Sequence, residues 1–556
     1  MKKMNLTIIL LASLLPYPLW AVQDSGTTFA ADALKPFLDS GEFSSAVVPL
    51  TAPLHGGDGG CSIFVEPESS KAGTKVELVA NGDFTDVFVT SSEPLSFVHL
   101  VWNERHGENA LVRGDAWERT YGDTGWDKID LNRALPWYYH IADGNLLMAR
   151  GVAVQPNALC CWRVGMDRTV LQIDLRAGGV PVKLGGRRLL ACRVTEMRRN
   201  NGREGDFAFA RRFCRRMMTA PVGKLPPVYG YNDWYCAYGR NTAANFIADV
   251  KVISDLTWGL TNRPYAVVDD GWQPNVPGVW CEWTGSSKRF GMPMDEFAGK
   301  LSKLGFKPGL WYRPLLPREK TPASRLLEGG ESLDPSNPEV LETVAGDIRR
   351  FREWGYELVK IDFITYEFCH GWGFNFGDRI VHGEMRFADE SHTTAEIVTR
   401  MYRTFRDAAG DGMVLIGCNA INHLAAGIFD LQRIGDDTSG NEWERTCKMG
   451  VNALAFRAEQ SGIFFQGDAD CVGLAKKGAI DWSRNRQWLD LVARSGTPLF
   501  VSWKRSLMDD EVRTALKEAF RKASEPRAVG FPLDWRETRR PRRWRFADGD
   551  VEYDWR

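Results

Sequence analysis

Residues 228–233 read VYGYND and begin a series of eight apolar, strand-like runs. The next three runs are YAVVDD (265–270), FKPGLWY (306–312) and ELVKIDF (357–363). The last four are MVLIGCN (413–419), DLQRIGDD (430–437), IFFQGDAD (463–470) and PLFVSW (498–503). Segments of helical length separate most of them, and only the gap between the fifth and sixth runs is limited to a small helix. Eight strands alternating with helices over about 300 residues predict a (β/α)8 barrel, the TIM-barrel fold.

A doubly wound open sheet is the alternative for a chain in which strands and helices alternate. Such sheets typically bind a phosphate at a glycine-rich turn after the first strand. The segment that follows Asp233 contains no such turn, so the barrel is the preferred interpretation.

Shorter β-rich runs flank the barrel on both sides. Residues 22–215 alternate runs such as KVELVANGDFTDVFVT and TVLQIDL with Asn-Gly and Asp-Gly turn signals, which predicts an N-terminal β-sandwich. The catalytic barrel is expected over 216–510. Residues 511–556 hold its final helix and a C-terminal β region (VGFPLDW, RRWRFADG, VEYDWR) with few strands for an independent core.

The first 21 residues are typical of a secretory signal peptide. Lys2 and Lys3 precede the mostly apolar run LTIILLASLL (6–15), and a cleavage site fits at Leu19-Trp20-Ala21. This run is shorter than the ~20 residues of a membrane span. We therefore expect a secreted or periplasmic protein that has no membrane contact after cleavage, and the sequence leaves its oligomeric state open.

The composition excludes several other classes of protein. The chain has 556 residues, of which 44% are apolar and 25% charged, which is ordinary globular usage rather than a disordered chain, a collagen or a coiled coil. Its 70 basic and 71 acidic residues give no reason to expect nucleic acid as a partner. The eleven cysteines show no zinc-type spacing, and the sequence does not assign any disulfide pairing.

Acidic side chains gather where five of the eight predicted barrel strands end. They are Asp233, Asp269, Asp270, Asp362, Asp436, Asp437, Asp468 and Asp470. One such aspartate often only caps the next helix, but barrel enzymes place their chemistry at the carboxyl ends of their strands. Carboxylates interleaved with tryptophans suit a glycosidase pocket. Because Lys360 and Arg433 lie among these acids and would repel a cation, we expect no metal.

Several of these strand ends resemble the α-galactosidases of glycoside hydrolase family 36. The matching motifs are VVDDGWQ, GLWYRP, VKIDF, GCN followed by RIGDDT, GYNDWY, FFQGDADC and SGTPLFVS, in the family's order. The resemblance covers most of residues 215–510 and implies a β-sandwich, a (β/α)8 barrel and a C-terminal β domain. It implies a carbohydrate substrate and no cofactor.

By this resemblance Asp362 is the nucleophile and Asp437 the acid/base of a retaining double displacement. Asp436 competes for the second role, but the family's acid lies four residues after the arginine of strand six, here Arg433. The remaining matched residues would bind the sugar: Asp269, Asp270, Trp311, Lys360, Cys418 and Arg433. Asp269 and Asp270 would bind the 4- and 6-hydroxyls of galactose, and Lys360 would hold hydroxyls beside the nucleophile. The tryptophan and the cysteine would line the ring, and the arginine would reach the 2-hydroxyl.

Other functions fit the same motifs. The expected activity is a secreted α-galactosidase that releases terminal α-D-galactosyl residues from oligo- or polysaccharides. The alternatives are an α-N-acetylgalactosaminidase or pentopyranosidase, a galactosyltransferase of the raffinose-synthase kind, and a carbohydrate-binding protein without activity.

The sequence does not decide how two segments shape the side of the site that would bind the leaving group. The loop ITYEFCHGWGFN (364–375) does not match the family, and GDAWERTYGDTGW (114–126) is either an ordinary sandwich loop or a segment that leans over the barrel mouth.

Overall fold

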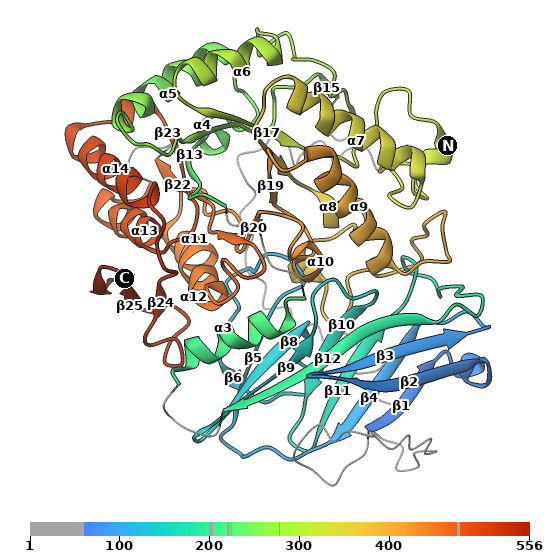
Figure 1. Cartoon of the computed structure of the whole chain (residues 1–556). Coiled ribbons are helices and arrows are strands. Elements are labelled where there is room, and N and C mark those ends of the chain that lie inside the picture. The colour runs from blue at the N-terminus through green and yellow to red at the C-terminus, as the bar shows by residue number, and fades with distance from the viewer. Residues whose placement is uncertain (1–60, 200–203, 220–222, 224, 277–278, 475–478) are drawn as a thin grey trace, which may run out of the picture.

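The computed structural model describes residues 61–556 except 200–203, 220–222, 224, 277–278 and 475–478. The predicted signal segment 1–21 and the start of the predicted sandwich lie outside these residues. Along the described chain, two antiparallel sheets come first, a curled parallel sheet with helices follows, and a small antiparallel sheet ends it (Figure 1). This order of folds is the one predicted.

The two N-terminal sheets form the β-sandwich. One sheet has the order β1 (Cys61–Glu66), β4 (Phe97–Asn103), β11 (Arg168–Asp174), β10 (Leu159–Val164), β7 (Leu135–Pro136). The other has the order β2 (Thr74–Asn81), β3 (Phe84–Ser91), β12 (Leu189–Arg199), β9 (Leu146–Val152), β8 (Tyr138–Asp143), β5 (Leu111–Gly114), β6 (Asp127–Lys128). The run KVELVANGDFTDVFVT becomes the hairpin β2–β3, whose Asn-Gly turn needs the left-handed conformation that Gly82 adopts (φ +59°).

Each of the eight predicted barrel runs contains a strand of one parallel sheet. Six follow in chain order: β13 (Tyr229–Asn232), β14 (Tyr265–Val268), β17 (Lys307–Tyr312), β18 (Leu358–Ile361), β19 (Val414–Gly417), β20 (Leu431–Arg433). The seventh bends at Asp470 (φ +71°) into β21 (Gln466–Asp468) and β22 (Cys471–Leu474). Because β21 pairs with β20 while β22 pairs with β23 (Leu499–Trp503), and β23 with β13, the sheet closes into a barrel.

Helices cover the outside of the barrel (Figure 1). The longer ones are α5 (Ala243–Leu256), α6 (Met294–Lys303), α7 (Pro338–Glu353), α9 (Thr394–Ala409), α13 (Trp482–Arg494) and α14 (Asp510–Ala523). In α7 the Asn337 side chain accepts the Glu339 N–H, Pro338 occupies the first turn, and the buried face repeats every three to four residues. Between the fifth and sixth strands only α10 (Asn422–Ala425) fits, as predicted.

The helix after strand six packs unusually close to the strand's end. It runs as α11 (Trp443–Thr446), a π-helical turn (Cys447–Asn452) and α12 (Ala453–Arg457). A Cβ at Gly435 would lie 1.8 Å from the Met449 carbonyl oxygen, so only glycine fits between the strand end and the π-helical turn. This close approach sets the course of the chain immediately before Asp436 and Asp437.

The C-terminal strands depend on their neighbours for a core. They are β24 (Phe531–Pro532), β25 (Arg543–Phe546) and β26 (Gly549–Glu552). Phe531 stacks on Phe207 of α3 (Asp206–Met217) with ring centroids 4.5 Å apart, and Trp535 stacks on Phe456 of α12. Three short strands bury little surface alone, so this sheet obtains its core by packing on both α3 and the barrel helix α12.

All eleven cysteines are unpaired, and ten of them are buried. Most of them therefore act as small apolar core residues, and none forms a cross-link. None of the helices in the described part of the chain has the length and apolar character of a membrane span.

Buried ion pairs attach the sandwich to the barrel. Arg457 of α12 binds Asp115 at 2.6 Å, and their side chains are 0% and 2% exposed. Arg113 binds Glu459 at 2.9 Å, with side chains 1% and 0% exposed. Beyond these pairs the chain runs along the end of strand six, where Thr120 N–H donates to the Ile434 carbonyl at 2.9 Å. Of the two alternatives for residues 114–126, the segment that leans over the barrel mouth is therefore the observed one.

We predict that Asp115→Asn lowers the free energy of unfolding of the chain. The substitution keeps the shape of the side chain but leaves the Arg457 guanidinium buried without its charge partner, which typically costs about 3–5 kcal/mol. Urea unfolding of the full chain measures the loss. As a control, Asp550→Asn removes the exposed Arg545–Asp550 pair and should leave the unfolding midpoint unchanged; equal midpoints for the two variants would contradict the role given to Asp115.

Candidate active site

Asp362 follows β18 directly and has an oriented carboxylate. Its Oδ2 accepts the Trp311 indole N–H at 3.0 Å, and its Oδ1 accepts the Phe363 N–H at 2.8 Å. The hydrogen-bond network also turns the amide nitrogen of Asn419 toward Oδ1. Phe363 has a φ of +63°, a conformation that a bulky residue adopts only when its surroundings impose it. Four features thus fix the direction of one buried carboxylate.

Lys360 lies two residues earlier on the same face of β18 and pairs with Asp269 of the second strand. Its Nζ donates to Asp269 Oδ2 at 2.7 Å, and Asn232 Nδ2 donates to the same oxygen at 2.7 Å. Burial opposes the lysine charge, but Asp269, Cys418 and Asp362 outweigh it and raise the pKa of Lys360. The lysine therefore stays charged among the acids.

Asp233 and Asp270 flank Asp269. The Asp233 Oδ1 accepts the Asp269 N–H at 2.7 Å, and burial raises the pKa of Asp233 to about 8. Gln273 Nε2 donates to Asp270 Oδ1 at 2.5 Å, and burial raises the pKa of Asp270 as well. The half-buried Asp270 lies on the rim, whereas Asp233 acts from beneath as a neutral acid that supports the strand end.

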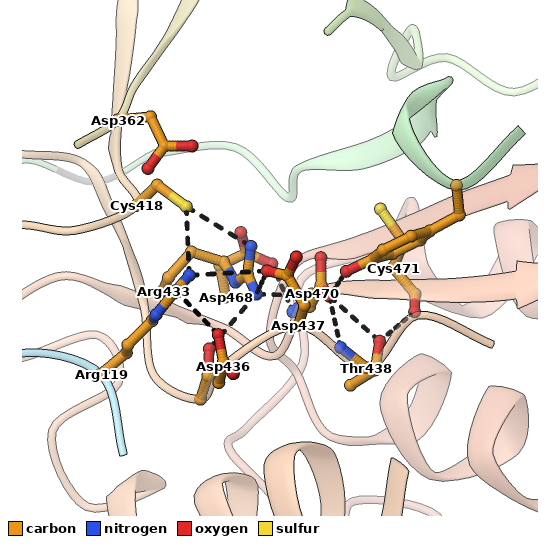
Figure 2. Close-up of polar contacts among 12 residues, drawn as sticks. Arg119, Asp362, Cys418, Arg433, Asp436, Asp437, Thr438, Asp468, Asp470 and Cys471 are labelled. Carbon is orange, nitrogen blue, oxygen red and sulfur yellow. Dashed lines mark hydrogen bonds and ion pairs between the residues drawn. The ribbon is translucent and has the colours of Figure 1, made fainter. Parts of the chain in front are cut away.

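Asp437 lies at the end of strand six between two arginines (Figure 2). Arg433 Nη2 approaches its Oδ1 at 3.1 Å and Arg119 Nη1 approaches the same oxygen at 3.5 Å. Burial disfavours the charge, but Arg433, Arg119 and Lys360 together lower the pKa of Asp437 to about 2. Its side chain remains 24% exposed, and the described residues donate no hydrogen bond to its Oδ2.

Asp436 has both oxygens occupied. Its Oδ1 binds Arg119 Nη2 at 2.7 Å, and its Oδ2 binds Arg445 Nη2 at 2.5 Å. Of the two adjacent aspartates, Asp437 therefore has the carboxylate oxygen that is free to reach a ligand.

The strand-five and strand-six side chains meet at a thiol. Arg433 Nη1 donates to Cys418 Sγ at 3.5 Å, and Arg119 Nη1 lies 3.7 Å from the same sulfur. Arg433 also lies 3.3 Å from Asp470, so its guanidinium is shared between strands five, six and seven.

Strand seven contributes Asp468 and Asp470, two strand-end acids to which the sequence assigned no role. Asp470 accepts hydrogen bonds from Thr438 N–H at 2.8 Å and from the Tyr235 hydroxyl. Burial raises the pKa of Asp468 to about 6 against the opposing charge of Arg433. A small cavity beneath the rim is lined by Asn232, Lys360, Arg433, Asp468, Asp470 and apolar side chains.

Trp311, which the family resemblance places against the sugar ring, is buried (4% exposed) and donates its indole N–H to Asp362. Trp272 N–H in turn donates to the Trp311 carbonyl at 3.0 Å. Trp311 therefore orients the carboxylate, and Trp272 holds the backbone of Trp311.

The structure brings the predicted site residues to one end of the barrel and adds others. Among the described residues no three His, Cys, Asp or Glu side chains are arranged as a metal site would need. The additions are Arg119, Asn419 and Tyr235. The strand-end rule could have found Asn419, which follows Cys418. For Arg119 the sequence offered only the alternative that residues 114–126 lean over the barrel mouth, with no role for this side chain.

Solved structures of known enzymes share this architecture. The α-galactosidase of Thermus thermophilus, solved with p-nitrophenyl α-D-galactopyranoside, matches with a TM-score of 0.59 and 16% identity over 89% of this chain and 97% of its own. A family 36 α-galactosidase of Geobacillus stearothermophilus matches with a TM-score of 0.55 and 12% identity over 87% and 71%. The α-galactosidase of Lactobacillus brevis gives 0.54 and 12% over 86% and 70%. The chain has the fold of the family 36 α-galactosidases. No family model and no curated protein matches the sequence itself.

The raised pKa of Asp233 predicts a pH dependence of stability. The folded chain keeps this proton up to about pH 8, whereas the unfolded chain loses it near pH 4. Stability should therefore fall as pH rises between these values, by up to about 1.4 kcal/mol per pH unit from this group. Asp233→Asn should flatten the dependence between pH 5 and 8 in urea unfolding. The exposed Asp255→Asn is the control, and a variant at 233 with the wild-type slope would contradict the assignment.

Proposed function

We propose that the chain is an exported retaining α-galactosidase that releases terminal α-D-galactosyl residues from oligo- or polysaccharides. The observation that carries the proposal is the fixed Asp362 carboxylate, which is hydrogen-bonded on both oxygens at the end of β18. A nucleophilic carboxylate needs this orientation toward an anomeric carbon. Export rests on Lys2, Lys3 and the apolar run after them.

The proposed sugar site lies around the Lys360–Asp269 pair. Asp269 binds the lysine ammonium, and Asp270, the next residue, lies on the rim with its carboxylate held by Gln273. Acceptors and a donor in this arrangement suit the 4- and 6-hydroxyls of galactose, whose axial O4 distinguishes it from glucose. The T. thermophilus enzyme has been solved with an aryl α-galactoside and with stachyose, which supports the same class of ligand here.

In the proposed mechanism Asp362 attacks the anomeric carbon while the bond to the leaving oxygen breaks and Asp437 donates a proton to that oxygen. This step leaves a β-linked galactosyl ester on Asp362. Asp437, now ionised, takes a proton from water, the water oxygen attacks the anomeric carbon, and Asp362 is released. Two inversions give net retention.

The resting charge of Asp437 places a condition on the first step. With a pKa of about 2, Asp437 is ionised in the free enzyme near neutral pH. Binding of the substrate must therefore weaken the contacts from Arg433 and Arg119 before the acid can act. The 3.5 Å contact to Arg119 is longer than the 3.1 Å contact to Arg433, so it is the easier one to break.

We predict that Asp362→Gly abolishes hydrolysis and that azide replaces the missing nucleophile. Azide should attack an aryl α-galactoside from the β face and yield β-galactosyl azide, which NMR identifies by its anomeric coupling. The wild type should release α-galactose first on the same spectrometer. Undiminished hydrolysis by the variant would refute the role of Asp362.

A panel of aryl α-glycosides separates the proposal from its alternatives. Wild-type preference for an N-acetylgalactosaminide or a pentopyranoside would change the sugar but keep the mechanism. Transfer to an acceptor sugar without hydrolysis would indicate a galactosyltransferase. No release from any α-glycoside would indicate a binding protein.

We predict different outcomes for the two adjacent aspartates. Asp437→Ala should lower kcat/KM on raffinose by about 10²–10⁴ but much less on an aryl galactoside, whose leaving group needs no proton. Azide should then give α-galactosyl azide by attacking the galactosyl enzyme. Asp436→Ala is the matched variant and should show no azide product. The reverse pattern would make Asp436 the acid/base.

A further inference from the structure

Arg119 enters the barrel site from the β-sandwich (Figure 2). Its neighbour Thr120 donates to the Ile434 carbonyl at 2.9 Å and accepts the Asp436 N–H at 3.0 Å. The sandwich segment therefore extends the parallel sheet by one bridge, Thr120 to Gly435, at the end of strand six. Because backbone hydrogen bonds on both sides fix Thr120, the side chain of the preceding residue, Arg119, is held beside the carboxylates.

The Arg119 guanidinium uses all three of its nitrogens in the site. Nη2 binds Asp436 at 2.7 Å, and Nη1 lies 3.5 Å from Asp437 and 3.7 Å from Cys418 Sγ. Nε donates to the Tyr121 hydroxyl at 3.3 Å and to the oxygen of Asn419 at 3.3 Å. Since the nitrogen of the same amide faces Asp362, one arginine is connected to both proposed catalytic carboxyls.

Aromatic rings hold the guanidinium in place. Its carbon lies 5.6 Å from the ring centroid of Trp372 and 5.8 Å from that of Tyr121, distances typical of cation–π contacts. Trp372 is itself stacked on Tyr366 at 4.7 Å. The loop 364–375, which does not match the family motifs, thus supplies a wall for this arginine.

Glu118, fully buried, ties that loop to the sandwich segment. Its Oε1 accepts the Gly373 N–H at 2.8 Å, and its Oε2 accepts the Thr365 hydroxyl at 2.5 Å. The unmatched loop and the sandwich segment are therefore one hydrogen-bonded unit around Arg119. Such support restricts the arginine to one orientation before any ligand binds.

We propose that Arg119 is a positioning residue that sets the protonation of Asp437 and, through Asn419, the orientation of Asp362, so that the sandwich is part of the catalytic unit. This proposal rests on the proposed function. Arg119 holds Asp437 ionised in the free enzyme and releases it when the leaving group occupies the site. The same contact returns after the second step, when Asp437 is again a carboxylate.

The electrostatic neighbourhood of Asp437 determines the sign of the expected effect. The charged or titratable groups around it are Arg119, Arg433, Arg445, Lys360, Asp436, Asp470, Tyr235 and Tyr238. Removing the Arg119 charge from this set takes away one of the cations that favour the ionised carboxylate. Asp437 should then keep its proton to higher pH, which moves the basic limb of the rate profile upward.

The test compares pH profiles of kcat/KM for Arg119→Gln, Arg119→Lys and wild type on raffinose. We expect the basic limb to move upward by about one pH unit or more in the glutamine variant and by less in the lysine variant, which retains the charge. An aryl galactoside with an activated leaving group should show little movement. Arg188→Gln is the control, because Arg188 also has an ion pair and an aromatic contact, with Glu77 and Phe88, but lies on the sandwich surface.

Two results would overturn the proposal. One is a glutamine variant whose rates fall equally on both substrates while the profile keeps its wild-type shape, which a purely structural role predicts. The other comes from infrared titration of the carboxyl groups, assigned with Asp437→Asn, if Arg119→Gln leaves the pKa of Asp437 unchanged. This readout needs no turnover, so it still decides the proposal if wild type hydrolyses no α-galactoside and the proposed function fails.

Discussion

The arrangement of this molecule depends on how buried carboxylates obtain cationic partners. Many acids converge at the carboxyl end of the barrel, and an unpaired buried charge costs several kcal/mol. Lys360 of strand four forms an ion pair with Asp269, and Arg433 of strand six forms ion pairs with Asp437 and Asp470. Asp436 forms ion pairs with Arg445 of the barrel and with Arg119 of the sandwich. Electrostatic compensation thus joins two domains that the sequence keeps far apart.

The same requirement is met at the interface below the site. Arg457 with Asp115, and Arg113 with Glu459, are pairs without solvent access that cross from barrel to sandwich. Such pairs add little net stability over apolar packing, but separation of the surfaces would leave each charge unpaired. They therefore specify one relative placement of the domains. This placement brings Glu118 and Arg119 over the barrel mouth, beside the acids of the candidate site.

Much of the fold could be predicted because its signals are local. Each apolar run of the barrel is short, bounded by turns and followed by a helical segment, and the parallel pairing then places all strand ends on one side. Asp269, Asp362 and Asp437 could be found by this rule alone. The bend at Asp470, which closes the sheet, could not, because its left-handed backbone follows from pairing with two different strands. The hydrogen bond from the Trp311 indole to Asp362 could not be predicted either, because it depends on how strands three and four pack.

The sequence by itself determined the eight strand runs of the barrel and the set of carboxylates on the rim, since hydrophobic periodicity and strand polarity are properties of short segments. It also supplied the motifs that relate the strand ends to family 36. Only the tertiary structure decided that Asp436 has both oxygens occupied while Asp437 keeps one that no described residue binds, and that an arginine of the sandwich contacts both acids. The physical reason is that charge compensation acts through space. The Arg119 guanidinium, more than 300 residues away in the chain, contacts both acids, and no local pattern of the sequence records this contact.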